Sequence, residues 1–96
     1  MNGTTNKAAT NLRKHGVTFE EGSSVLSDPY VLIREDVDHS VTEARIQAVG
    51  NSKRLRELFV VFVEINDDTA RIVMARKATR RERESYEKRK AKTQKR

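Results

Sequence analysis

The 96-residue sequence predicts a single α+β domain over residues 1–96: a small antiparallel sheet of about four strands, preceded by two N-terminal helices and followed by one C-terminal helix. Two observations support this order. Apolar residues recur at helical spacing near both ends of the chain, whereas the middle carries short β-rich runs. The turns between these runs are too short for a crossover helix, so successive strands should pair antiparallel, and we expect the helices on one face of the sheet.

The N-terminal quarter contains the signals for two short helices. Residues 6–15 have one-face apolar spacing, and Gly16 suits the left-handed end of that helix. Thr18 and Glu21 have the spacing of a capping box, in which the hydroxyl and the carboxylate both bind free amides at a helix start. We expect this second helix to run to about Ser27, because the Asp-Pro pair that follows cannot continue it.

The expected strands are four runs rich in β-branched and aromatic residues, at 30–33, 44–49, 58–65 and 70–76. The third run is almost unbroken in its apolar character, which is typical of a central strand covered on both sides. On the fourth run, Ile72, Met74 and Arg76 should share a face by alternation. A guanidinium at the end of such an apolar row needs an anion, either a structural carboxylate or a bound phosphate.

The C-terminal region combines a helix signal with a strong positive charge. Thr79 and Glu82 again have capping-box spacing, so a third helix should start there, persist to about Arg89 and leave residues 88–96 as a frayed basic tail. The whole chain has a formal charge of +6, and the entire excess lies in residues 79–96, which carry nine basic and three acidic side chains. Such a segment attracts polyanions such as RNA or DNA, but it equally keeps a small protein soluble.

Composition excludes several classes of protein. The absence of cysteine excludes disulfide frameworks, zinc–thiolate sites and thiol catalysis. The longest apolar run, Leu58–Val63, has six residues against the roughly 20 needed to cross a bilayer, so we expect a soluble, cytoplasmic protein without a membrane contact. No glycine-rich phosphate loop is present. The two histidines are far apart, and the acidic residues fit turn chemistry, so we expect neither a metal nor another cofactor.

The remaining polar residues could cleave a phosphodiester without metal. That reaction needs a proton acceptor, a proton donor and positive charge on the pentacoordinate phosphorus, and in RNA the substrate's own 2′-hydroxyl supplies the nucleophile. An imidazole such as that of His39 can titrate near neutral pH, Glu43 can act as a base or orient one, and Arg45, Arg56 and Arg76 can hold phosphate. The competing interpretation is that His39 is solvated in a loop and that the arginines form structural ion pairs.

Short motifs follow one another along residues 6–87: Asn6-Lys7-Ala8, Asn11, Lys14-His15-Gly16-Val17-Thr18-Phe19-Glu20-Glu21, Asp28-Pro29, Asp38-His39-Ser40, Glu43-Ala44-Arg45, Gly50-Asn51-Ser52, Ala75-Arg76-Lys77-Ala78-Thr79, Arg83 and Tyr86. In this order they resemble the BrnT toxins of type II toxin–antitoxin systems. The resemblance implies a RelE-like α+β endoribonuclease that cuts RNA without metal and inhibits translation. It also implies a BrnA-like ribbon-helix-helix antitoxin, a heterotetramer of two toxins and two antitoxins, and operator DNA bound through the antitoxin.

The resemblance also implies which residues form the site. The positions that match the proposed active face are His39, Glu43, Arg45, Arg56 and Arg76. Cations expected to contact RNA are Lys14, Lys77, Arg80, Arg81 and Arg83. For Lys14 and its neighbour His15, a position at a helix C-terminus is a sufficient structural role, since cations there are favoured by about 0.3–1 kcal/mol.

Departures from the family pattern at three positions leave a second function open. Leu55 stands where a glycine is usual, which should reshape that hairpin, and Ile65 and Met74 replace polar residues near the expected site. These changes point to weakened ribonuclease activity. The alternatives are a non-catalytic regulator that binds nucleic acid through the basic helix, or a toxin homologue that acts only through its antitoxin complex.

Overall fold

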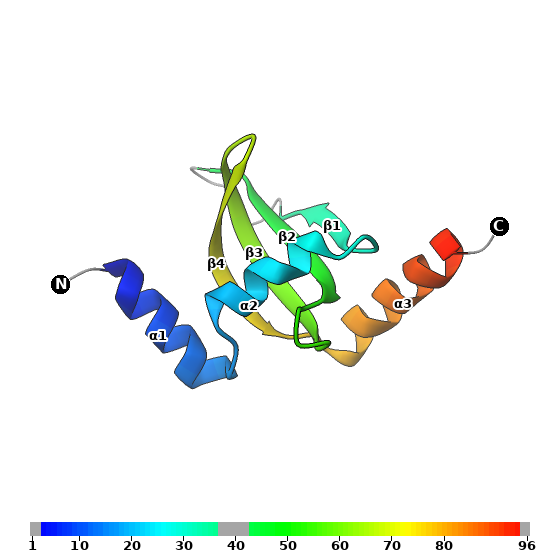
Figure 1. Ribbon diagram of the computed structural model, residues 1–96, viewed down its shortest axis with the longest axis horizontal. Coiled ribbons are helices and arrows are strands. Elements are labelled where there is room, and N and C mark those ends of the chain that lie inside the picture. The colour runs from blue at the N-terminus through cyan, green and yellow to red at the C-terminus, as the bar shows by residue number, and fades with distance from the viewer. Residues whose placement is uncertain (1–2, 37–42, 95–96) are drawn as a thin grey trace.

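The computed structural model describes residues 3–36 and 43–94 of the chain, and the side chains of residues 7–36 and 43–94. The elements are two N-terminal helices, a 3₁₀ turn, four strands and a C-terminal helix: α1 (Gly3–His15), α2 (Phe19–Ser24), η1 (Val25–Ser27), β1 (Leu32–Glu35), β2 (Arg45–Asn51), β3 (Glu57–Asn66), β4 (Thr69–Lys77) and α3 (Arg80–Gln94) (Figure 1). The predicted α+β class and element order are confirmed.

The four strands form one antiparallel sheet in the order β1-β2-β3-β4. β3 lies inside the sheet, as its apolar run predicts, and it is buried on both faces. Val60 and Phe62 pack on the side of α2 and η1, whereas Phe59 and Val61 pack on the side of α3. Val17 and Val25 complete the first cluster, and Tyr86 of α3 completes the second.

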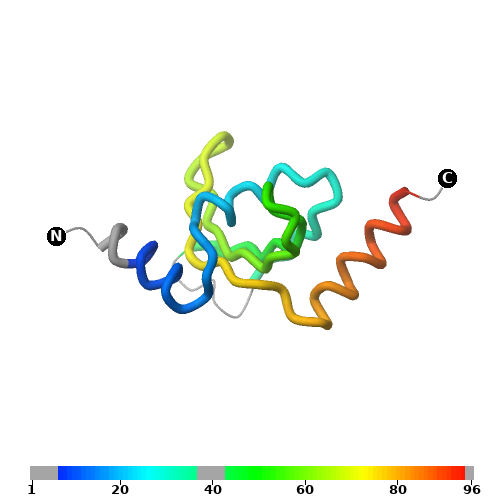
Figure 2. The backbone as a smooth tube through the Cα atoms, turned by 60° about the horizontal axis from the view of Figure 1, so that its bottom comes forward, coloured from blue at the N-terminus to red at the C-terminus, as the bar shows by residue number. Residues whose placement is uncertain are grey.

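The expectation that the helices share one face of the sheet is wrong. A strand that is apolar on both sides needs a cover on both sides, because each exposed face would leave apolar area in water. α2 and η1 cover one face, and α3 supplies fully buried Tyr86 to the other. α1 and α3 project from opposite sides of the body, as Figure 2 shows, and the molecule measures 51 × 27 × 24 Å.

α1 ends before Gly16 and α2 begins after Thr18, as the sequence predicts, with one exception at the start of α2. Gly16 adopts a φ of +69° beyond α1, and the Thr18 hydroxyl accepts a hydrogen bond from the Glu21 amide at 3.0 Å. The second half of the predicted capping box is wrong. The Glu21 side chain turns away from the helix start and accepts hydrogen bonds from Arg56 and Ser52 instead. A buried carboxylate gains more from a guanidinium and a hydroxyl than from one amide.

α3 begins with a complete capping box. The Thr79 hydroxyl accepts from the Glu82 amide at 3.2 Å, and the Glu82 carboxylate accepts from the Thr79 amide at 2.8 Å. The helix continues to Gln94, five residues past the predicted end at Arg89. Its second half consists mostly of residues with high helix propensity, and Lys92 lies in the last turn, where a cation is favourable.

β4 departs from simple alternation. Val61 pairs with Met74, but its neighbour Phe62 pairs with Ile72, so β4 has one extra residue at Val73. This β-bulge places Ile72 and Met74 on opposite faces, which contradicts the prediction that they share one.

α1 protects the outer edge of β4. The Asn11 side-chain amide donates to the Ala75 carbonyl at 2.8 Å and accepts from the Ala75 amide at 3.2 Å. A buried amide therefore replaces the missing neighbour strand. Among the described helices, none combines the length and the apolar character that a membrane-spanning segment requires.

Candidate functional site

The sheet face that packs against α3 carries four arginines. Directly opposed residues of an antiparallel sheet point to the same side, so the register assigns each of them to the face of Phe59 and Val61. Four arginines and one glutamine extend from this surface, which we name the arginine face: Arg34, Gln47, Arg45, Arg71 and Arg76. Arg34 and Arg71 are exposed, and the other three are partly buried.

One end of the arginine face combines a carboxylate with several cations. Arg45 and Arg71 both lie opposite Val63, one on each side of β3. Arg71 Nη2 donates to Glu43 Oε1 at 3.1 Å, across 28 residues of sequence. Glu43, Arg45, Arg71 and Lys7 of α1 line a common open hollow of about 600 Å³. Phe19 of α2 and Ile72, which belong to the opposite side of the sheet, also line it, so the hollow is shared by the arginine face and the α2 side. The sequence predicted Glu43 and Arg45 together, and the structure places them together.

His39 lies outside the described residues, so its predicted role stays a prediction. The chain positions on either side are described. The Asp36 amide donates to the Arg45 carbonyl at 2.8 Å, and Glu43 stands two residues before Arg45. The ends of the segment that carries His39 therefore lie at the same end of the sheet as Glu43 and Arg45.

Arg56 lies on the other side of the sheet. Its Nε donates to Glu21 Oε2 at 2.9 Å, its Nη2 donates to Glu21 Oε1, and Nη2 also reaches the Gly16 carbonyl at 3.2 Å. These partners belong to α2 and to the α1–α2 connection. The Glu21 side chain is only 2% exposed, and the bonds from Arg56 lower the pKa of its carboxyl to about 2, against the opposing effect of burial. The expected convergence of Arg56 with Arg76 is therefore not found.

Arg76 is on the arginine face but is already engaged. Its two terminal nitrogens each donate to a Glu82 oxygen at 2.9 Å, and its guanidinium lies 4.1 Å from the centre of the Phe59 ring. Burial opposes ionisation of Glu82, but hydrogen bonds from Arg76 and Thr79 outweigh it and lower the pKa of Glu82 below its usual value. Of the two interpretations of Arg76, the structural ion pair is observed.

The cations expected to contact RNA are distributed over three elements. Lys14 is exposed in the last turn of α1, and Lys77 is exposed at the end of β4. On α3, Arg80 pairs with Glu84 at 3.2 Å, and Arg83 donates to the Ala78 carbonyl at 3.1 Å. Arg81 lines a cavity of about 330 Å³ that opens between α3 and the arginine face.

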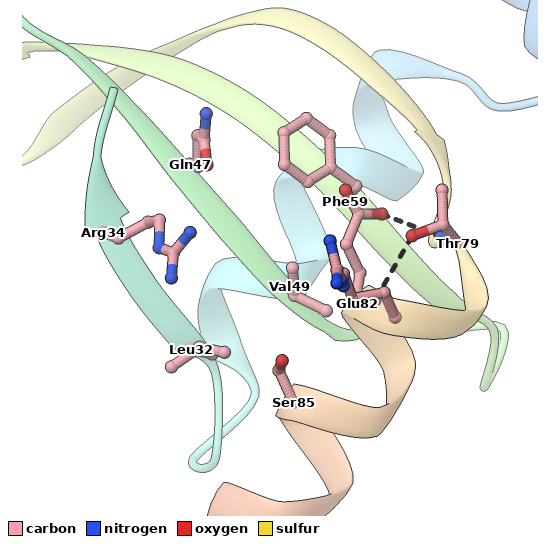
Figure 3. Close-up of a pocket in the computed structure, with 9 residues that line it drawn as sticks. Leu32, Arg34, Gln47, Val49, Phe59, Thr79, Glu82 and Ser85 are labelled. Carbon is pink, nitrogen blue, oxygen red and sulfur yellow. Dashed lines mark hydrogen bonds between the residues drawn. The ribbon is translucent and has the colours of Figure 1, made fainter. Parts of the chain in front are cut away.

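This cavity has an apolar floor and polar walls (Figure 3). Leu32, Val49 and Phe59 form the floor. Arg34 extends over it from β1, and the Ser85 hydroxyl points from α3 toward the sheet. The described residues contain no group of three or more histidine, cysteine, aspartate or glutamate side chains that could hold a metal ion.

Sequence reasoning missed five polar residues that line these two sites: Lys7, Arg34, Gln47, Arg71 and Ser85. Arg71 could have been found by extending the hairpin pairing back from the turn at residues 66–68. The cavity could not have been found in that way, because it forms only once α3 folds back across the end of the sheet.

Residues 4–82 match the family model described as "Ribonuclease toxin, BrnT, of type II toxin-antitoxin system". The matched segment includes all residues that line the hollow at Glu43 and Arg45, and all that line the cavity beside α3 except Ser85. No curated protein matches the chain.

Proposed function

The chain belongs to the BrnT family of ribonuclease toxins of type II toxin–antitoxin systems, and from this premise we propose that it is a metal-independent endoribonuclease that inhibits translation by cutting RNA on the arginine face. The observation that carries the proposal is the hollow lined by Glu43, Arg45, Arg71 and Lys7. It combines a partly exposed carboxylate with three cations at one end of the sheet. These are the group types that metal-free diester cleavage needs.

The proposed reaction uses the 2′-hydroxyl of the RNA as nucleophile. Glu43 or His39 accepts the 2′-hydroxyl proton as the O2′–P bond forms. The guanidiniums of Arg45 and Arg71 stabilise the charge that develops on the phosphorane oxygens. The P–O5′ bond then breaks, and the second of the two acid–base groups protonates the departing 5′-oxygen. The products are a 2′,3′-cyclic phosphate and a 5′-hydroxyl, so all atoms come from the RNA.

Arg56 and Arg76 have a different part in this proposal. Both guanidiniums form two-point ion pairs with glutamates of the protein, Glu21 and Glu82. A guanidinium held in this way is a weak competitor for an incoming phosphate, because the carboxylate must first be displaced. Arg71 also pairs with Glu43, but only one of its nitrogens makes the contact, at 3.1 and 3.4 Å, and both side chains are about half exposed, so a phosphate can compete for it. We therefore assign Arg56 to positioning α2 and Arg76 to positioning α3, and leave the chemistry to His39, Glu43, Arg45 and Arg71.

Membership of a type II toxin family implies an antitoxin partner. We propose that the antitoxin is a BrnA-like ribbon-helix-helix protein, that two toxins and two antitoxins form the complex, and that operator DNA binds through the antitoxin. The simplest way to silence the enzyme is to cover the hollow at Glu43 and Arg45. Inducible expression with and without the adjacent gene tests toxicity and neutralisation together.

The direct test is incubation of the purified chain with end-labelled single-stranded RNA in EDTA. We expect cleavage that ends in 2′,3′-cyclic phosphate. Glu43→Gln should reduce the rate by about 10²–10⁴-fold, the usual contribution of a general acid or base, if Glu43 rather than His39 is the base. Arg13→Ala, which removes an exposed cation from the last turn of α1, is the matched control and should cleave normally. RNA that stays intact with folded wild-type protein would refute the nuclease.

A non-catalytic regulator is the second candidate, because two observations favour it. Glu82 engages Arg76, and the exposed cations of α3 form a long basic surface that no other described element covers. The same assay separates the two candidates. Binding that weakens steeply as salt rises, without any cleavage product, would support the regulator.

A further inference from the structure

We propose that the cavity between α3 and the arginine face binds one purine base of the RNA, and that Gln47 and Arg34 read its edge. The inference rests on the proposed function, since it names the part of the RNA that this same face recognises. The cavity measures about 330 Å³, near the lower limit of the roughly 300–1,000 Å³ typical of ligand pockets. That size suits one planar ring system and its sugar.

The chemistry of the cavity walls matches a nucleobase. A base needs an apolar surface for its ring and donors and acceptors in the plane of its edge. Leu32, Val49 and Phe59 supply the apolar floor. Gln47 carries a donor and an acceptor side by side, and Arg34 carries a fork of donors. The Hoogsteen edge of a purine accepts such two-point contacts, from an amide for adenine and from a guanidinium for guanine.

The two reading residues are positioned by the sheet. Arg34 and Gln47 are direct partners in the β1–β2 register, so their side chains leave the same face next to each other. Ser85 approaches from α3 on the opposite side, as Figure 3 shows. Glu82 also lines the cavity, but its oxygens accept hydrogen bonds from Arg76 and Thr79. The one carboxylate in the wall is therefore paired with a cation.

The cavity is placed to select the nucleotide beside the cleavage site. Gln47 and Arg45 are two residues apart on β2 and share a face, which separates their backbones by about 7 Å. A phosphate held at Arg45 thus leaves an adjacent base within reach of Gln47. Arg81, on the α3 side of the cavity, can contact the next phosphate. This continuity with a cationic surface favours RNA over a side chain of a protein partner as the occupant.

The first experiment measures base binding with the full chain. Amide NMR spectra are recorded with 5′-AMP, 5′-GMP, 5′-CMP and 5′-UMP. We expect purine nucleotides to shift the signals of Gln47, Val49 and Ser85, with dissociation constants at least about tenfold below those of the pyrimidines. Gln47→Glu keeps the size of the side chain and replaces the amide donor by an acceptor. This variant should change the order in which the four nucleotides bind. Gln94→Ala at the end of α3 is the matched control and should bind as wild type.

The second experiment measures sequence preference by sequencing the cleavage products of a random RNA pool. Wild type should prefer a purine at one position beside the cut, and Gln47→Glu or Arg34→Ala should flatten or change that preference. Cleavage with unchanged preference in both variants would overturn the base pocket and leave the nuclease intact. Purine binding without cleavage by any folded variant would overturn the nuclease and support the pocket. Signals at Gln47 and Ser85 that shift only with antitoxin would show a protein occupant and overturn the inference.

Discussion

Removal of the Arg56 guanidinium should destabilise the fold strongly and should not act on the cleavage chemistry itself. Arg56 is the only described side chain that forms an ion pair with Glu21, whose side chain is 2% exposed. Truncation of Arg56 leaves that carboxylate buried with one remaining side-chain partner, the Ser52 hydroxyl at 2.6 Å. Breaking a buried pair on one side costs about 3–5 kcal/mol. That is a large part of the ~5–15 kcal/mol by which small domains are stable.

The pKa of Glu21 gives an independent magnitude. The usual carboxyl value is 4.5, and the folded value is about 2. A pKa difference of one is worth about 1.4 kcal/mol, so the ionised form of Glu21 contributes about 3 kcal/mol to folding. The folded pKa is depressed, so this stability is fully present above pH 4.5 and is lost as the pH falls toward 2.

Urea denaturation at pH 7 and at several values between pH 2 and 5 tests both estimates. We expect Arg56→Ala to lower the free energy of unfolding by about 3–5 kcal/mol at pH 7 and to flatten its fall below pH 4.5. Glu21→Gln should cost less, because the partly exposed Arg56 can then turn to water. Arg56→Lys keeps a charge if the alanine variant does not fold. The reasoning would be refuted if Arg56→Ala lowered the free energy of unfolding by less than about 1 kcal/mol and still lost stability below pH 4.5 as steeply as wild type.

Three further perturbations probe other parts of the fold. Leu55 is 84% exposed at a φ of +62°, so Leu55→Gly should stabilise the protein by up to about 1 kcal/mol, whereas Leu55→Ala should give no gain in thermal midpoint. Tyr86→Phe deletes the hydroxyl that donates to Asp28 at 2.5 Å and should cost about 1.5–3 kcal/mol in urea; an unchanged midpoint would contradict that contact. Burial and the neighbouring Glu87 raise the pKa of Glu57 to about 7. Between pH 4.5 and 7 the folded chain therefore holds a proton that the unfolded chain releases, so the free energy of unfolding should fall as the pH rises through this range. Glu57→Gln should remove that fall, as measured by urea midpoints at pH 5 and pH 8, and equal pH dependence in both proteins would show that Glu57 ionises normally.

Local signals in the sequence predicted most of the fold. Gly16, Thr18 and the Thr79–Glu82 pair mark helix ends through contacts within a few residues, and the structure shows each of those backbone contacts. The prediction that Leu55 reshapes its hairpin stays a prediction; Leu55 itself adopts a φ of +62°, the left-handed conformation that glycine adopts most easily. Contacts of this kind depend on spacing alone.

The features that the sequence could not predict are those that depend on contacts between residues far apart in the chain. The destination of the Glu21 carboxylate depends on Arg56, 35 residues away, and the neutralisation of Arg76 depends on how α3 packs. The bulge at Val73 reverses the alternation of side chains along β4. Ile72 therefore does not lie on the same face as Arg76, although the two residues are an even number of positions apart. Glu43 and Arg45 were predicted together because they are two residues apart, whereas Arg71 joins them only through the β3–β4 pairing.

The most direct measurement is the single-turnover rate of RNA cleavage in EDTA by two charge-matched, folded variants. Arg45→Ala removes a guanidinium from the proposed phosphate site, and Arg13→Ala removes one from the end of α1. The account predicts a loss of about 10²–10³-fold in Arg45→Ala, the usual effect of deleting a group that stabilises transition-state charge, and a wild-type rate in Arg13→Ala. Equal rates in the two variants would contradict the assignment of RNA cleavage to the arginine face.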